Sequence, residues 1–530
     1  MGRRIVLIAC PVMLLLSMTA GVVHAQPAVF SARVQVTDHA LNTVRPMLFG
    51  DNIEWVHHGM GLWQPENTQF DESLIRELKA AGITHLRYPG GTLSDFFDWS
   101  GAVGPKRRPQ PNPFDKGKTE YPDFGPDEFI ALCRRLGIPG TITVNAGTGT
   151  PELAGAWAEY LHRKKFRVAQ FEVGNEIYMA DASKEEVPAL PVAKTAGQYV
   201  DFYLRTAAAI RKASPGTPVG AIGLFDTGAF SLNRHADWME KLLTKAGDRL
   251  DFLAIHNGYA PATTLTMLGG RQQRQPDEEV ARSLLGASEY VRQNIETTKA
   301  GIARYVPGGG RRIGLLITEY GPLVYPLDPS HAIEDLAWNR NLAGALYQAC
   351  LFNVLLREPR IIGGNHLPLC QDGFGALVGV HGSGAERKQW RNVVFYVFQL
   401  YSRLGGRTVL DTRVESPVYS TISIGIVPAL KDVALIDAAA YRSKDRHSTK
   451  VYLVNRDVWR TGSVRIDPAA RRYRVSSVTT LASESFKAEN GPDKLDAVKP
   501  VSTAGPPGLR SGDFAVSLPP HSLTIVEFTQ

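Results

Sequence analysis

The chain is poor in cysteine and has no long apolar run beyond its first residues. Only 4 cysteines occur among 530 residues, and one of them, Cys10, precedes the globular part of the sequence. That number is far too low for a fold that depends on a framework of disulfides. After the leader, no stretch approaches the roughly 18 apolar residues that a membrane-spanning helix needs, so we expect no membrane anchor.

Motifs for nucleotide chemistry and for serine nucleophiles are also missing. The sequence contains no P-loop, no dinucleotide-binding glycine fingerprint after a strand, and no Gly-x-Ser-x-Gly elbow. The net charge is +7, but the basic residues are scattered and lack the interleaved aromatic residues of a single-strand binder. We therefore expect no nucleic-acid partner. The pair His57-His58 stands without an HExxH motif or a cysteine cluster, so we expect no metal and no other cofactor.

The first 25 residues have the pattern of a secretory leader. Arg3 and Arg4 supply a positive start, residues 5–18 are almost entirely apolar, and small residues precede a cleavage position after Ala25. The apolar stretch is too short to span a bilayer. We predict a signal peptide at residues 1–25, and with it a secreted or periplasmic location.

From residue 45 to residue 404, short apolar segments alternate with segments that have apolar residues at helical spacing. The strands read as continuously apolar, which is typical of a parallel sheet that is buried on both faces. The pattern predicts an α/β fold, a (β/α)8 TIM barrel. The predicted strands are Met47–Ile53, Ile83–Tyr88, Gly140–Asn145, Val168–Asn175, Pro218–Gly223, Phe252–His256, Gly314–Glu319 and Ile361–His366.

The last part of the chain has a different residue pattern. Residues 405–530 contain short segments with alternating β-branched residues, such as KVYLVNRD and SLTIVEFTQ, separated by turn signals. This predicts a C-terminal antiparallel β-sandwich. Residues 26–44 include FSARVQVTD, which has the same alternation, and we expect this strand to join the sandwich.

Polar side chains occur at the carboxyl ends of the predicted barrel strands, where barrel enzymes carry their functional groups. Glu176 follows the fourth strand and Glu319 ends the seventh. With both side chains pointing inward, about 5 Å between the carboxyl groups is attainable, which is the separation of a retaining glycosidase. The negative charge of the partner should raise the pKa of Glu176 so that it can act as the acid.

Four segments together resemble a known family. The stretches LRYPGGTLSDFFDW, CRRLGIPGTITVNAGTGTPELAGAWAEY, FEVGNE and LLITEYG are similar to retaining (β/α)8 glycoside hydrolases, most closely the α-L-arabinofuranosidases of glycoside hydrolase family 51. The resemblance implies an enzyme that releases terminal α-L-arabinofuranosyl groups from plant polysaccharide by double displacement. It makes Glu176 the general acid/base and Glu319 the nucleophile.

The resemblance also implies roles for residues around this pair. Asn175 would bond the sugar hydroxyl beside the anomeric carbon, Arg87 would hold the nucleophile ionised, and Glu54 would bind sugar hydroxyls. His256 and Tyr259 match a pair near the nucleophile, although their spacing differs from that of the family. Homo-oligomer formation is a further expectation that the resemblance allows.

Two positions depart from the family pattern. Thr92 stands where family members carry Asn, and Asn365 or His366 stands where they carry a glutamine near the eighth strand. Both positions bind sugar in the family, so the substrate is less determined than the catalytic pair. The sequence leaves open the same mechanism on a pyranoside, namely a β-glucoside, β-xyloside or β-glucuronide. It also leaves open a non-catalytic barrel that only binds carbohydrate.

Overall fold

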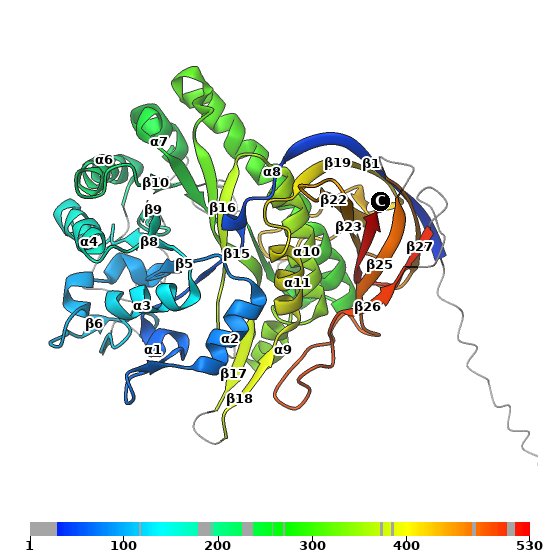
Figure 1. The fold of residues 1–530 in the computed structure, drawn as a ribbon, viewed down its shortest axis with the longest axis horizontal. Coiled ribbons are helices and arrows are strands. Elements are labelled where there is room, and N and C mark those ends of the chain that lie inside the picture. The colour runs from blue at the N-terminus through cyan, green and yellow to red at the C-terminus, as the bar shows by residue number, and fades with distance from the viewer. Residues whose placement is uncertain are drawn as a thin grey trace, which may run out of the picture.

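The computed structural model has two bodies, a barrel ringed by helices and a large sheet that carries the C-terminus, with α8, α10 and α11 between them (Figure 1). The structure describes residues 29–115, 118–178, 192, 194–224, 237–256, 258–268, 271–370, 375–382, 386–468, 473–505 and 515–530. The leader predicted at residues 1–25 lies outside these ranges.

Eight parallel strands form the barrel, which confirms the predicted fold class. The strand order is β11-β10-β9-β8-β5-β2-β16-β15, and the pairing of β11 with β15 closes the ring. The barrel strands are β2 (Gly50–Asn52), β5 (His85–Tyr88), β8 (Gly140–Val144), β9 (Val168–Val173), β10 (Val219–Ile222), β11 (Phe252–Ile255), β15 (Gly314–Tyr325) and β16 (Ile361–His366). Their carboxyl ends meet at one mouth, as in any parallel barrel.

Some helices around the barrel begin at strong local signals. The Asp71 carboxylate caps α2 by accepting hydrogen bonds from the backbone N–H groups of Ser73 and Leu74, and Gly82 ends this helix with φ 82°. Thr150 caps α4 in the same way, with Pro151 at the first helical position. The helices are α1 (Val56–Met60), α2 (Glu72–Ala81), α3 (Pro126–Leu136), α4 (Pro151–Arg163), α6 (Ala196–Ala213), α7 (Trp238–Ala246), α8 (Asp277–Tyr305), α9 (Ala332–Ala337), α10 (Leu342–Arg357) and α11 (Val393–Ser402).

The second body is a nine-stranded sheet in the order β26-β25-β28-β23-β22-β19-β1-β24-β27. Most of its pairings are antiparallel, but β1 lies parallel to β24 and antiparallel to β19. Its strands are β1 (Val29–Thr43), β19 (Thr408–Glu415), β22 (Ile436–Arg442), β23 (Ser448–Asn455), β24 (Thr461–Asp467), β25 (Arg474–Leu481), β26 (Val501–Ala504), β27 (Ala515–Leu518) and β28 (Ser522–Thr529). The residue bounds of the domains stay a prediction.

The remaining strands are short. The strand β12 extends the barrel sheet beside β15, and the others form two-stranded sheets. They are β3 (Trp63–Gln64), β4 (Gln69–Phe70), β6 (Gln110–Pro111), β7 (Thr119–Glu120), β12 (Gly258–Thr263), β13 (Leu265–Leu268), β14 (Arg271–Arg274), β17 (Val378–His381), β18 (Lys388–Arg391), β20 (Val418–Tyr419) and β21 (Val433–Ala434).

A buried polar network joins the two bodies. The guanidinium of Arg456 is almost completely buried, donates to the Ser288 hydroxyl at 3.1 Å, and lies 3.5 Å from Glu289 and 3.8 Å from Asp437. Asn353 of α10 donates to Asp437 at 2.8 Å. Such groups must be satisfied because a lone buried charge is costly, so the network holds α8 and α10 of the barrel against the sheet.

Two predicted strand bounds are wrong in ways that matter for the site. The first strand begins at Gly50 and not at Met47, because residues 46–48 form a 3-10 turn. The seventh strand does not end at Glu319 but continues to Tyr325, because β12 pairs with it over its second half. Glu319 therefore lies in the middle of a hydrogen-bonded strand, which restricts its backbone.

Candidate active site

The two predicted catalytic carboxylates lie close together at the barrel mouth. Glu319 comes from β15, whereas Glu176 follows β9 after a sharp turn in which Gly174 has φ 82° and Glu176 itself has φ 43°. A left-handed conformation is rare for glutamate, and such conformations cluster at functional sites. The Nδ1 atom of His256 lies 2.7 Å from Glu176 Oε1 and 3.7 Å from Glu319 Oε2. One carboxylate oxygen from each glutamate and one ring nitrogen of His256 all lie within 4.8 Å of one another.

Arg87 is the centre of the hydrogen-bond network below the carboxylates. It is fully buried, and its Nε donates to Glu172 Oε2 at 2.6 Å. Its Nη1 donates to Glu319 Oε1 at 3.0 Å and to Asn52 Oδ1 at 2.9 Å, and its Nη2 donates to Asn175 Oδ1 at 2.7 Å. One rigid side chain therefore orients the candidate nucleophile and the candidate sugar-binding amide together.

Burial and neighbouring charges shift the pKa values of three groups in this cluster. Burial, aided by the negative charge of Glu319, raises the pKa of Glu54 to about 7, although Arg87 opposes the shift. Burial alone would lower the pKa of His256, but Glu319 and Glu176 overcome this effect and raise it. Burial would also lower the pKa of Arg87, and the carboxylates of Glu172 and Glu319 raise it instead. The carboxylates thus stabilise the charged forms of Arg87 and His256, and burial favours the neutral form of Glu54.

Backbone positions beside the pair are also constrained. Asp95 accepts hydrogen bonds from the backbone N–H of Asn175 at 3.3 Å and of Ala146 at 3.4 Å, which fixes the turn that carries Glu176. Gly91 packs against the nucleophile so closely that an added Cβ would lie 3.0 Å from Glu319 Oε1. A side chain at residue 91 would therefore push on the carboxylate.

The remaining predicted site residues lie at different depths. Thr92 begins a short 3-10 helix and is half-buried. Asn365 is fully buried in β16 and donates to the backbone carbonyl of Asp51 at 3.1 Å, so this donor is engaged inside the barrel. His366 lies 3.3 Å from the Asp51 carboxylate. Tyr259 lies in β12 opposite Gly321, and its side chain is outside the described part. Roles of these residues in sugar binding stay predictions.

Glu176, His256 and Glu319 could also serve as metal ligands by geometry. One imidazole and two carboxylates are donors that zinc accepts. The guanidinium of Arg87 lies only 3.0 Å from Glu319, however, and its positive charge opposes a second cation there. The same trio supplies what an acid/base pair requires, so we assign no metal role.

Two residues of the site were not predicted from the sequence. Glu172 sits on β9, four residues before Glu176, and is fully buried beside Arg87. Asp95 lies in the short 3-10 helix after β5 and is also fully buried. A charged residue inside a buried strand was the available signal for Glu172, whereas nothing in the local pattern marks Asp95.

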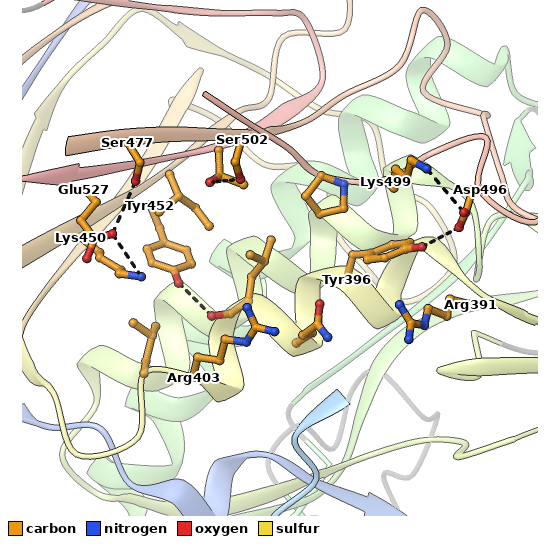
Figure 2. Close-up of a pocket in the computed structure, with 16 residues that line it drawn as sticks. Arg391, Tyr396, Arg403, Lys450, Tyr452, Ser477, Asp496, Lys499, Ser502 and Glu527 are labelled. Carbon is orange, nitrogen blue, oxygen red and sulfur yellow. Dashed lines mark hydrogen bonds and ion pairs between the residues drawn. The ribbon is translucent and has the colours of Figure 1, made fainter. Parts of the chain in front are cut away.

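A separate groove of about 390 Å³ lies between α11 and the sheet of the second body (Figure 2). It shares no residue with the cluster at the barrel mouth. Its polar groups are largely engaged with each other: Tyr396 donates to Asp496 at 3.0 Å, Tyr452 donates to the Leu400 carbonyl at 2.9 Å, and Lys450 lies 3.6 Å from Glu527. These pairings favour a domain contact over a ligand site.

Comparisons with known sequences agree with this geometry. The family profile described as "Alpha-L-arabinofuranosidase C-terminal domain" matches residues 319–522, and "Alpha-L-arabinofuranosidase 1 domain" matches residues 77–158. An intracellular exo-alpha-(1->5)-L-arabinofuranosidase of Streptomyces lividans is 25% identical over 91% of this chain and 73% of its own length. The Bacillus subtilis enzyme named intracellular exo-alpha-(1->5)-L-arabinofuranosidase 1 is 20% identical over 87% of this chain and 92% of its own.

A solved structure shares the fold. The GH51 arabinofuranosidase from Xanthomonas axonopodis pv. citri superposes with a TM-score of 0.76 and 22% identity, over 94% of this chain and 99% of that one.

The comparisons correct one prediction. A secreted or periplasmic location is contradicted, because the relatives from S. lividans and B. subtilis are named intracellular enzymes. Within the described ranges, no helix has the length and apolar character that crossing a bilayer requires. The fold, the matched profiles and the paired carboxylates agree, and the chain is a glycoside hydrolase that resembles the α-L-arabinofuranosidases of glycoside hydrolase family 51.

Proposed function

We propose that this chain removes terminal α-L-arabinofuranosyl groups from a carbohydrate with retention of configuration. The observation that carries the proposal is the pair Glu176 and Glu319, in which a carboxylate oxygen of one residue lies within 4.8 Å of a carboxylate oxygen of the other. Retaining enzymes place their carboxyl groups about 5 to 5.5 Å apart, whereas inverting enzymes leave about 6.5 to 9.5 Å for a water. The arabinofuranosyl specificity comes from the relatives named above.

In the first step, an oxygen of Glu319 attacks the anomeric carbon and the bond to the leaving oxygen breaks. Glu176 donates its proton to that oxygen. The hydrogen bond from Arg87 fixes the attacking carboxylate, and the imidazole of His256 bridges the two glutamates. The product of this step is a covalent glycosyl-enzyme.

In the second step, Glu176 takes a proton from water, and the water oxygen attacks the anomeric carbon. The bond between the anomeric carbon and the Glu319 oxygen breaks at the same time. Two inversions give net retention. Because the nucleophile must be ionised and the acid protonated at the start, kcat/KM should be bell-shaped in pH.

The test is release of nitrophenol from four aryl glycosides, with Glu319→Gln as the blank. The panel contains the α-L-arabinofuranoside, β-D-xyloside, β-D-glucoside and β-D-glucuronide. Preference for the arabinofuranoside supports the proposal, and preference for a pyranoside refutes the sugar assignment. Adding methanol tests the stereochemistry, since a retaining enzyme forms the methyl α-L-arabinofuranoside as the transfer product.

A further inference from the structure

Glu172 is a buried carboxylate that the two-glutamate mechanism does not use. It is the penultimate residue of β9 and has no exposed surface. Its Oε2 accepts two hydrogen bonds, from Arg87 Nε at 2.6 Å and from Thr143 Oγ1 at 2.7 Å. Burying a charged group is costly unless it is paired, so the presence of a carboxylate here needs a reason.

The position of Glu172 determines how Arg87 presents its other donors. A guanidinium is planar, so an acceptor on Nε also sets the directions of Nη1 and Nη2. With Nε directed at Glu172, Nη1 reaches Glu319 Oε1 at 3.0 Å and Nη2 reaches Asn175 Oδ1 at 2.7 Å. A small rotation of the plane would weaken both contacts at once.

Glu172 also divides the charge of Arg87. Two carboxylates, Glu172 and Glu319, form ion pairs with the single guanidinium. A nucleophile that faced the cation alone would be held more tightly, and its negative charge would be less available for attack. The competing carboxylate offsets part of that stabilisation.

We propose that Glu172 is a positioning residue for catalysis: through Arg87 it aims the nucleophile Glu319 and the amide of Asn175, and it keeps the nucleophile reactive. The proposal rests on the assignment of Glu319 as nucleophile made above. It does not depend on which sugar the enzyme accepts.

The test is Glu172→Gln, which keeps the shape and removes the charge. We expect kcat/KM to fall about 10- to 100-fold, as for a displacement of reacting groups by a fraction of an ångström. We also expect the acidic limb of the kcat/KM profile to move to lower pH by about 1 unit. The sign follows because loss of a nearby negative charge makes ionisation of the remaining carboxylates easier.

Gln170→Met is the matched control. Gln170 is buried two residues earlier on β9 and donates to Thr141 Oγ1 at 3.1 Å. Among the described residues, the side-chain acceptors of Arg87 are instead Glu172, Asn52, Glu319 and Asn175. This variant should lower the melting temperature and leave the pH profile in place. Thr143→Val removes one of the two hydrogen bonds to Glu172 and should slow turnover in the same direction but less, so it carries the test if Glu172→Gln does not fold.

The profiles are measured with the aryl glycoside that the wild-type enzyme hydrolyses fastest. A folded Glu172→Gln enzyme with wild-type kcat/KM and an unmoved acidic limb would overturn the proposal, as would a Gln170→Met enzyme that moves the limb equally. Preference for a pyranoside would overturn the sugar assignment and leave this inference intact. A wild-type enzyme that is inactive on the whole panel would overturn both.

Discussion

Replacing Arg87 by lysine tests the network at the barrel mouth most directly, because it keeps the charge and removes the geometry. The guanidinium makes four hydrogen bonds from three nitrogen atoms, to Glu172, Asn52, Glu319 and Asn175. A lysine ammonium has three donors on a single atom and cannot reach acceptors on all sides. We therefore expect at least two of the four bonds to be lost.

The size of the effect follows from the contacts that disappear. A hydrogen bond to a charged group contributes about 1.5 to 3 kcal/mol, so two lost bonds should lower the free energy of unfolding by about 3 to 6 kcal/mol. For catalysis, losing one preorganised donor to a group that changes its charge costs about 100- to 1,000-fold in kcat. The variant should therefore be much slower and measurably less stable.

The assay is kcat/KM on the preferred aryl glycoside, together with a urea titration of each variant. Arg456→Lys is the control, because Arg456 is also almost completely buried but lies at the contact between barrel and sheet. It should lose stability and keep its turnover per folded molecule. A folded Arg87→Lys enzyme within threefold of wild-type kcat/KM would refute the reasoning.

Three further predictions concern the same mouth. Glu319→Ala should abolish turnover, and azide should restore it as a glycosyl azide of inverted configuration; if Glu176→Ala gives that product instead, the two roles are exchanged. Burial raises the pKa of Glu54 from 4.5 to about 7, so the ionised form destabilises the fold increasingly from pH 4.5 to 7. Glu54→Gln should therefore raise the melting temperature at pH 8 and not at pH 4, and an equal change at both values would contradict the shift. Gly91→Ala should lower kcat about 10-fold with little loss of melting temperature, because its Cβ would lie 3.0 Å from Glu319 Oε1; unchanged kcat would show that the carboxylate can move aside.

Much of the barrel could be predicted because its signal is local. The alternation of apolar strands with amphipathic helices is written along the chain, and the predicted Ile361–His366 strand has the observed bounds. The predicted end of the seventh strand, at Glu319, is wrong, because the pairing of β15 with β12 extends this strand to Tyr325. The pairing of two strands that are distant in the sequence produces no hydrophobic periodicity in either strand, so local patterns do not predict it.

The candidate site, like the barrel, could be predicted only in part from the sequence. Glu176 and Glu319 could be proposed from the sequence, because a carboxylate in or just after a buried strand needs an explanation and barrel strands share one mouth. The roles of Arg87 and Asn175 followed from the family resemblance and stay predictions. The contact of His256 with both glutamates depends on where β11 meets β9 and β15, which the spacing in the sequence does not state.

The sequence by itself therefore determined the fold class and the two bodies and predicted the two carboxylates, because hydrophobic periodicity and the polar residues in or just after buried strands are properties of contiguous residues. Only the tertiary structure decided that Glu172 and Glu319 share one guanidinium. It also decided that burial and the charge of Glu319 raise the pKa of Glu54. Electrostatic coupling depends on distance and on exclusion of water, and both arise only when the strands close into a barrel.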